Sequence, residues 1–189
     1  LIEQPTAPVI FLTSATSDIT TISTFLDKAE NKTWRNKIRA LPITSLDSQA
    51  IIDHYIYTTC DKAKIIIVRL LGSRHYWSYG FEQLQAWQEQ HENRKLVVIS
   101  GTKEFNLELN DISSINTDLV EHIQHLLYEG GNSNIKSFFS IISQLLISES
   151  VDKNLYQVEV LTDPFCWEWE YKEGFKVLVI LYNLYLKSA

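Results

Sequence analysis

Short apolar runs that alternate with helical patterns constrain the fold of this chain more than any other feature. Continuous apolar runs lie at residues 9–12, 64–72 and 95–100, and a weaker run at 36–43 includes Pro42 near its end. The segments between them place apolar side chains at helical spacing, as in Phe81, Leu84 and Trp87. Since short buried strands separated by helices form parallel sheets covered on both faces, this order predicts an α/β fold with a doubly wound, mostly parallel sheet of the flavodoxin-like type.

The second half of the chain departs from this alternation. A polar stretch over residues 101–116 precedes two helical patterns, at 117–128 and 133–148, which the sequence EGGN separates. Residues 151–174 carry Pro164 and two tryptophans and have the character of a connector, and KVLVILY at 176–182 is typical of a new buried strand. We therefore expect an α/β domain over residues 1–150 with an added C-terminal helix pair, a connector over 151–174, and the first strand of a truncated following domain over 175–189.

Composition and charge exclude several classes of function. The net charge of −6 and the sequence pI of about 5.4 disfavour a nucleic-acid partner, which normally selects basic surfaces. The longest apolar stretch, FKVLVILYNLYL, is too short for a membrane span, and no signal peptide is apparent. Two distant cysteines, Cys60 and Cys166, are typical of reduced thiols, so we expect a cytoplasmic protein. The absence of methionine and an end directly after a strand-like segment indicate a piece of a longer protein.

The segment VRLLGSRHYWSYG, residues 68–80, is the main candidate for a binding site. It follows the strongest predicted strand, and ligands of open parallel sheets bind at the carboxyl ends of strands. Its arginines can form forked hydrogen bonds to acid groups, its aromatic rings can stack on a planar ligand, and its glycines permit close approach. A large planar molecule edged with acid groups matches these properties; alternatively, the aromatic rings fill a domain interface and the arginines pair with acidic residues of the chain. The candidate residues are Arg69, Gly72, Arg74, Tyr76, Trp77, Tyr79 and Gly80.

Other polar residues give weaker signals. Glu129 and Asn134 flank the glycines between the two helical patterns; they are further binding candidates, although glycine and asparagine there are also typical of helix caps. His122 and His125 have a spacing that permits metal ligation, but their pattern favours an ordinary helix face. No phosphate-binding loop and no nucleophile with an adjacent base is apparent. We therefore assign no catalytic residue and no metal ligand.

Three blocks of the sequence resemble one protein family. They are VIFLTSATSDI at 9–19, AKIIIVRLLGSRHYWSYGFEQL at 63–84 and LYEGGNSNIKSFFSII at 127–142. In order and spacing they resemble the large subunit of aerobic cobaltochelatase (CobN), a relative of the large porphyrin-binding subunit of magnesium chelatase. The matching positions include most of the binding candidates, with Ser73 in place of an expected glycine. The resemblance thins over residues 27–50 and 150–172.

The resemblance implies a fold and a function. Such subunits bind a tetrapyrrole-derived macrocycle and, with an AAA+ ATPase subunit and a second small subunit, insert a divalent metal into it. In the cobalt branch the ring is a corrin, hydrogenobyrinic acid a,c-diamide, cobalt is a substrate, and the product leads to cobalamin. ATP is then hydrolysed on the partner subunit, and we expect no cofactor on this chain, which would be an N-terminal domain without activity of its own.

Two alternatives to this function stay open. One is a magnesium chelatase subunit that acts on a porphyrin, and the other is a scaffold or docking domain that never contacts the ring. Burial of Trp77 would favour docking, whereas an open pocket that holds Arg69 and Arg74 would favour binding.

Overall fold

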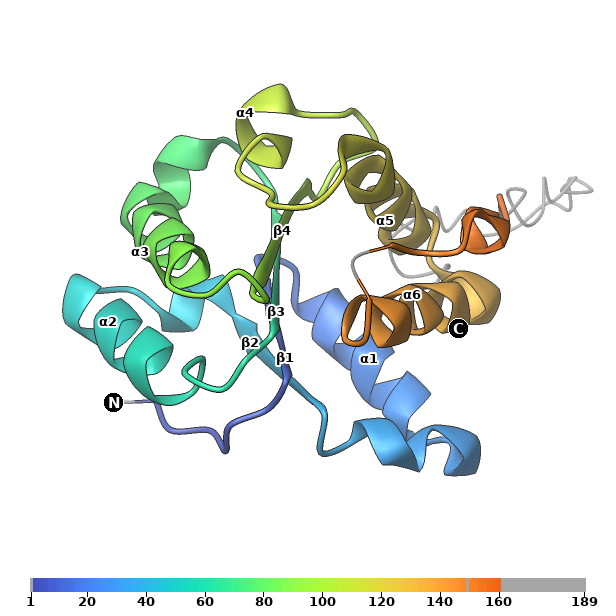
Figure 1. Ribbon diagram of the computed structural model, residues 1–189, viewed down its shortest axis with the longest axis horizontal. Helices are drawn as coiled ribbons and strands as arrows, with labels where there is room; N and C mark the ends of the chain where they lie inside the picture. Colours follow the sequence, from blue (N-terminus) through green and yellow to red (C-terminus); the bar gives the residue numbers. More distant parts are fainter. Residues whose placement is uncertain (1, 149, 161–189) are drawn as a thin grey trace, which may run out of the picture.

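The four strands in the described part of the chain form one parallel sheet. The computed structural model describes residues 2–148 and 150–160. The strands β1 (Val9–Thr13), β2 (Ile38–Pro42), β3 (Ile65–Leu70) and β4 (Lys95–Ser100) are hydrogen-bonded in the order β2-β1-β3-β4 (Figure 1). Every pairing is parallel, so the predicted doubly wound, parallel α/β fold is confirmed. The strand expected over 175–189, and the connector from 161 onward, lie outside the described residues.

Helices cover both faces of this sheet. On one face lie α2 (Gln49–Thr58) and α3 (Ser78–Glu89), and on the other lie α1 (Thr16–Asp27), α5 (Thr117–Glu129) and α6 (Gly131–Leu145) (Figure 1). Shorter helical turns connect them: η1 (Ala29–Trp34), η2 (Ile43–Ser45), η3 (Arg74–Trp77), α4 (Leu107–Asn110) and η4 (Lys153–Leu155). The helix pair α5–α6 is the predicted C-terminal addition, and it packs on the same face as α1.

The continuous apolar character of the strands follows from this two-sided cover. Val9 and Phe11 of β1 belong to the core under α1, α5 and α6, whereas Ile10 and Leu12 belong to the core under α2 and α3. Successive strand residues point to opposite faces, so a strand buried on both sides is apolar along its length, and its polar residues, Thr13 of β1 and Arg69 of β3, lie at or next to its carboxyl end. All five residues of β1 and all six of β3 are buried.

Two local elements differ from the sequence-based expectation. The single turn α4 lies inside the predicted loop, where the side chain of Asn106 accepts a hydrogen bond from the backbone N–H of Leu109. One helical turn is too short to produce a periodic pattern, so the sequence did not indicate it. Helix α6 begins at Gly131 rather than at 133, because Gly130 and Gly131, with φ of 64° and 79°, complete the turn between the helices by themselves.

Residues 151–160 pack back onto the helix pair. Asn134 of α6 donates from Nδ2 to the carbonyl oxygen of Glu159 and accepts at Oδ1 from its N–H, both at 2.8 Å. The ring of His122 stacks on Tyr156 with centroids 4.8 Å apart, and its Nε2 lies 3.1 Å from the carbonyl oxygen of Leu155. Residues 151–160 are therefore attached to α5 and α6 by side-chain contacts.

His122 is expected to make the stability of the protein depend on pH. Burial lowers its pKa below the ordinary value of 6.5, more than the hydrogen bond to Leu155 raises it. Below pH 6.5 the unfolded chain therefore takes up a proton that the folded protein resists, and stability falls as the pH falls. We expect the melting temperature to drop between pH 7 and pH 5, and the drop to be smaller in His122→Phe, which keeps a ring against Tyr156.

The exposed His91 provides the matched control for this measurement. A His91→Phe variant is expected to retain the acid dependence of the wild type. An equal drop in wild type and His122→Phe would contradict the prediction.

Candidate functional site

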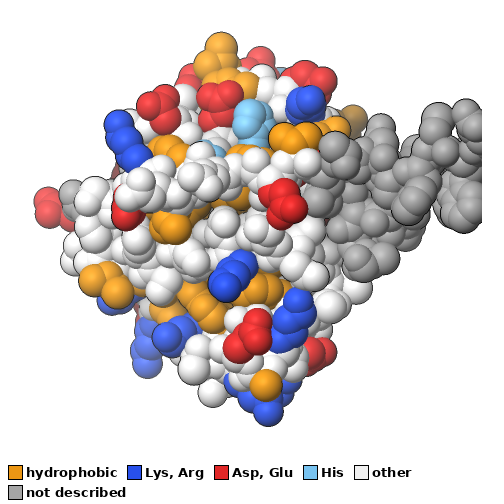
Figure 2. Space-filling view, turned by 90° about the vertical axis from the view of Figure 1, so that its right-hand side faces the viewer, with side chains coloured by type: hydrophobic (Ala, Val, Ile, Leu, Met, Phe, Trp, Pro, Cys, Tyr) orange, Lys and Arg blue, Asp and Glu red, His pale blue; other side chains and the backbone are white. Residues whose placement is uncertain are grey.

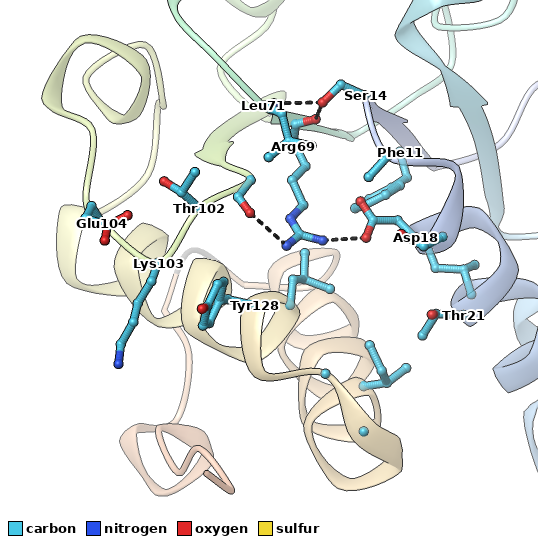
Figure 3. Close-up of a pocket in the computed structure, with 18 residues that line it drawn as sticks. Phe11, Ser14, Asp18, Thr21, Arg69, Leu71, Thr102, Lys103, Glu104 and Tyr128 are labelled. Carbon is cyan, nitrogen blue, oxygen red and sulfur yellow. Dashed lines mark hydrogen bonds and ion pairs between the residues drawn. The ribbon is translucent and has the colours of Figure 1, made fainter. Parts of the chain in front are cut away.

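A cavity of about 440 Å³ opens at the carboxyl ends of β1, β3 and β4. The chain leaves β1 toward β2 on one side and β3 toward β4 on the other, so the gap between β1 and β3 is the topological switch point of the sheet, where ligands of such folds bind. Helix α1 and the α5–α6 pair close its sides (Figure 3). Its apolar walls are formed by Phe11, Ile22, Leu71, Leu127 and Ile135. This cavity is called the switch-point pocket below.

Arg69 forms the base of the switch-point pocket. It is the second-last residue of β3, its exposed fraction is 6%, and its guanidinium forms an ion pair with Asp18 of α1 (Figure 3). Its Nη2 also donates to the carbonyl oxygen of Gly101 at 3.3 Å. The remaining Nε–H is buried and has no hydrogen-bond partner among the residues the structure describes. Asp18 accepts a further hydrogen bond from Thr13 Oγ1 at 2.5 Å, which fixes the carboxylate facing Arg69.

Ser14 holds the loops after β1 and β3 together. Its N–H donates to the carbonyl oxygen of Arg69 at 3.0 Å, and its Oγ accepts from the N–H of Leu71 at 2.7 Å. The N–H and the hydroxyl of Ser14 thus extend the pairing of β1 and β3 beyond the ends of the strands. The mouth of the pocket is fixed on both sides of the switch point.

Gln124 shapes the third side of the switch-point pocket, and the sequence analysis missed it. This residue of α5 is 1% exposed. Its Nε2 lies 3.0–3.3 Å from the carbonyl oxygens of residues 102–104, and its Oε1 accepts from the N–H of Ser100 and from Asn110 Nδ2, both at 3.2 Å. One amide therefore fixes the loop after β4, which lines the pocket. A signal was present, because Gln124 lies four residues after Val120 on the apolar face of its helix.

The aromatic candidates do not join Arg69 in the switch-point pocket. Trp77 is buried in the domain's own core, where its ring meets Phe81 edge-on at 5.4 Å and its Nε1 donates to the carbonyl oxygen of Leu46 at 3.4 Å. Gly80 makes this placement possible, since a Cβ at that position would lie 2.2 Å from the indole. Because Trp77 packs inside the domain, its burial does not favour a docking surface over a ligand site.

Two other residues of the candidate segment, Tyr76 and Tyr79, line a second hollow, of about 580 Å³, beside η2 and the start of α2. Tyr76 is 79% exposed there, and the hydroxyl of Tyr79 donates to the carboxylate of Asp53, whose oxygens lie at 2.8 and 3.0 Å. Gly72, at φ of 113°, supplies the backbone turn before η3. Arg74 lines neither cavity. The predicted segment is thus divided, and of its two arginines only Arg69 reaches the switch-point pocket.

The candidates between α5 and α6 lie beside the pocket. Gly130 and Gly131 line it, whereas Glu129 is buried and does not. Asn134 holds the backbone of Glu159 and also donates to the carbonyl oxygen of Gly130 at 2.7 Å, so its contacts are with the protein itself. In the part of the chain that the structure describes, no group of three acidic, histidine or cysteine side chains is placed to hold a metal ion.

The surface beside α1, α5 and α6 is mixed in character. On this side of the molecule, Figure 2 shows hydrophobic side chains in a hollow across the middle, with Lys and Arg side chains beside and below it. None of the helices within residues 2–148 and 150–160 has the length and apolarity needed to cross a membrane.

These features define a class of protein. An open parallel sheet with a largely apolar pocket at its switch point is typical of ligand-binding α/β domains. No family model matches the chain. The chain is similar to the aerobic cobaltochelatase subunit CobN of a Sinorhizobium species, with 25% identity over 143 residues, which is 76% of this chain. It is also similar to the CobN subunit of Pseudomonas aeruginosa, with 28% identity over 98 residues, 52% of this chain.

A solved structure of a cobaltochelatase subunit resembles the described fold. The catalytic subunit of cobaltochelatase from Mycobacterium tuberculosis superimposes on 77% of this chain with a TM-score of 0.56 and 20% identity. The chain spans about a tenth of each relative, 11% of the Sinorhizobium and Mycobacterium proteins and 8% of the Pseudomonas protein. The resemblance to a CobN-type N-terminal domain, which the three sequence blocks indicate, is confirmed by these similarities.

Proposed function

We propose that this chain is part of the large subunit of an ATP-dependent cobaltochelatase, and that its switch-point pocket holds one edge of the macrocycle. The metal is Co²⁺, the ring is the corrin hydrogenobyrinic acid a,c-diamide, and an AAA+ ATPase with a second small subunit supplies the energy. The similarity to CobN supports the subunit. The residues that insert the metal lie in other parts of the same large subunit.

The proposed role of the switch-point pocket is supported by its combination of size, apolar walls and one buried arginine. A cavity of about 440 Å³ lies within the roughly 300–1,000 Å³ range of small-molecule sites. It accommodates an edge of a large ring with a side arm, while the rest of the ring extends beyond the domain. A pocket that holds one edge fixes the orientation of the ring. During metal insertion the ring nitrogens lose protons while the metal loses water, and correct orientation of the reactants is a large part of what an enzyme contributes to such a step.

Filling the switch-point pocket is expected to remove macrocycle binding. Thr21 of α1 lines the pocket, and Thr24, three residues later on the same helix, is exposed to solvent. We expect the full chain to bind metal-free corrin saturably, and Thr21→Trp to weaken this binding at least tenfold, about 1.4 kcal/mol. Thr24→Trp adds the same side chain outside the pocket and is expected to bind as the wild type does. Equilibrium dialysis measures both.

Each other outcome of this titration has a definite meaning. Tighter binding of a metal-free porphyrin than of the corrin would replace the cobalt branch with the magnesium branch. Binding of neither ring would overturn the macrocycle role of the pocket. The exposed Tyr76, beside the second hollow, would then support the docking alternative.

A further inference from the structure

The switch-point pocket and the second hollow are neighbours that share one wall. Ser14 and Leu71 line both of them. The Oγ of Ser14 accepts a hydrogen bond from the N–H of Leu71 at 2.7 Å, so the wall is a bonded unit, called the Ser14–Leu71 ridge below. In the view of Figure 3 the ridge lies above Arg69. A ligand that leaves the pocket on this side passes over the ridge and reaches the second hollow.

The side chain of Leu71 makes the ridge apolar on its solvent side. It is 47% exposed. It also lies so close to Gly101 that a Cβ there would come within 2.6 Å of its Cγ and Cδ2. The backbone after β4 therefore supports the side chain from one side and leaves the other side uncovered. Covering it with an apolar part of a ligand is favourable, because apolar surface is removed from water.

Tyr76 continues this apolar surface into the second hollow. Its side chain is 79% exposed and lines the hollow. One edge of its ring lies against Gly72, where a Cβ would come within 2.8 and 2.9 Å of ring atoms Cδ2 and Cε2. Among the described residues, the ring has no hydrogen-bond, ion-pair or aromatic partner. A ring that is supported from one side and uncovered on the other is suited to packing against a flat ligand.

The remainder of the second hollow is polar. Exposed hydroxyl and amide groups line it, from Thr44, Ser48, Gln49 and Ser78. These groups can form hydrogen bonds with oxygen or nitrogen atoms at the edge of a ligand. A concave surface that combines apolar contact with a few polar groups is typical of small-molecule sites. The second hollow therefore suits a continuation of the ligand in the pocket.

We propose that the ligand of the switch-point pocket crosses the Ser14–Leu71 ridge and packs against Tyr76, so that one ligand occupies both hollows. The identity of the ligand as a macrocycle rests on the proposed function. A flat ring that enters the pocket by one edge leaves most of its surface outside, and the ridge and Tyr76 cover part of that surface before the ring extends beyond the domain. Tyr76 then contacts the ligand, whereas its neighbour Trp77 serves the core.

The test is equilibrium dialysis of the full chain with metal-free corrin. Tyr76→Ala is expected to weaken binding at least fivefold while one ring is still bound per chain at saturation. Tyr76→Phe keeps the aromatic ring and removes only the hydroxyl, so it is expected to recover most of the affinity. Because Tyr76 is exposed, both variants are expected to fold, and thermal melting checks this.

Two exposed residues outside both hollows provide matched controls. Tyr57 of α2 is 84% exposed, and Tyr57→Ala is expected to bind as the wild type does. Leu71→Asp places a charge on the ridge and is expected to weaken binding at least tenfold. Leu107 of α4 is 64% exposed, and Leu107→Asp is expected to have no effect on binding. Equal losses in Tyr76→Ala and Tyr57→Ala would contradict a specific contact at Tyr76.

The outcomes separate this inference from the proposed function. Binding that is lost in Thr21→Trp but unchanged in Tyr76→Ala would leave the macrocycle site in the pocket standing and overturn its extension across the ridge. Two rings bound per chain, one of which Tyr76→Ala removes, would indicate two separate sites and overturn the single ligand. Absence of any corrin binding would overturn the proposed function, and the extension with it.

Discussion

Replacing Gln124 with leucine is expected to destabilise the protein by about 4 kcal/mol, since each buried polar group left without a partner costs roughly 1–3 kcal/mol. The change leaves the N–H of Ser100 and the amide of Asn110 without their acceptor and the carbonyl oxygens of residues 102–104 without their donor. Leucine matches glutamine closely in size, so the effect is one of hydrogen bonding rather than of volume. Urea denaturation measures it.

The control for Gln124 is a glutamine without such a role. Gln85 of α3 is half-buried and makes no side-chain hydrogen bond in the described part of the chain, so Gln85→Leu is expected to change stability by less than about 0.5 kcal/mol. Gln124→Glu tests the direction of the hydrogen bonds. A carboxylate still accepts from the N–H of Ser100, but it places a negatively charged oxygen, in place of the donor, against the carbonyl oxygens of residues 102–104. We expect it to be destabilising too. A loss below about 1 kcal/mol in Gln124→Leu would contradict the central role given to this amide.

Gly80→Ala is the second change with a large expected effect. In an ordinary helix, alanine in place of glycine stabilises by about 1 kcal/mol. Here the new Cβ would lie 2.2–2.4 Å from three atoms of the buried Trp77 ring. Overpacking of a core costs about 1–3 kcal/mol and at times more, so we expect a net loss of at least about 2 kcal/mol, measured as a shift in the urea midpoint.

Two comparisons identify the Trp77 ring as the cause of that loss. At Gly101 a Cβ would first meet the side chain of Leu71, which is 47% exposed and can move aside, so Gly101→Ala is expected to cost less. In the Trp77→Leu background the ring is absent, and Gly80→Ala is expected to lose most of its penalty. Additive losses in that double variant would show that Gly80 and Trp77 do not interact in the way the geometry requires.

The sheet could be predicted from the sequence because helices cover both faces of its strands, so both faces are apolar. Strands buried on both faces are apolar at nearly every position before their ends, and the three strong runs, at 9–12, 64–72 and 95–100, coincide with β1, β3 and β4. The place of Arg69 followed from the same pattern, since a charged residue near the end of such a strand lies at the ligand edge of the sheet. These conclusions need only local information.

The rest of the candidate site depends on contacts that no local pattern records. Asp18 pairs with Arg69 across 51 residues of sequence, and nothing in either segment indicates the other. In η3 a tight helical turn directs Trp77 inward and leaves Tyr76 outside, although both rings looked equally suited to a ligand. Gln124 was missed because the apolar pattern of its helix drew attention to the leucines around it.

Asn134 gives the domain a mechanical property. The same Nδ2 donates to the carbonyl oxygen of Gly130, which lines the switch-point pocket, and to that of Glu159, near the end of the described chain. A force applied to the chain after Glu159 therefore acts on the side chain that holds the rim of the pocket. The backbone at Glu159 and the rim of the switch-point pocket therefore share one hydrogen-bonding side chain, so a displacement of one strains the hydrogen bond to the other.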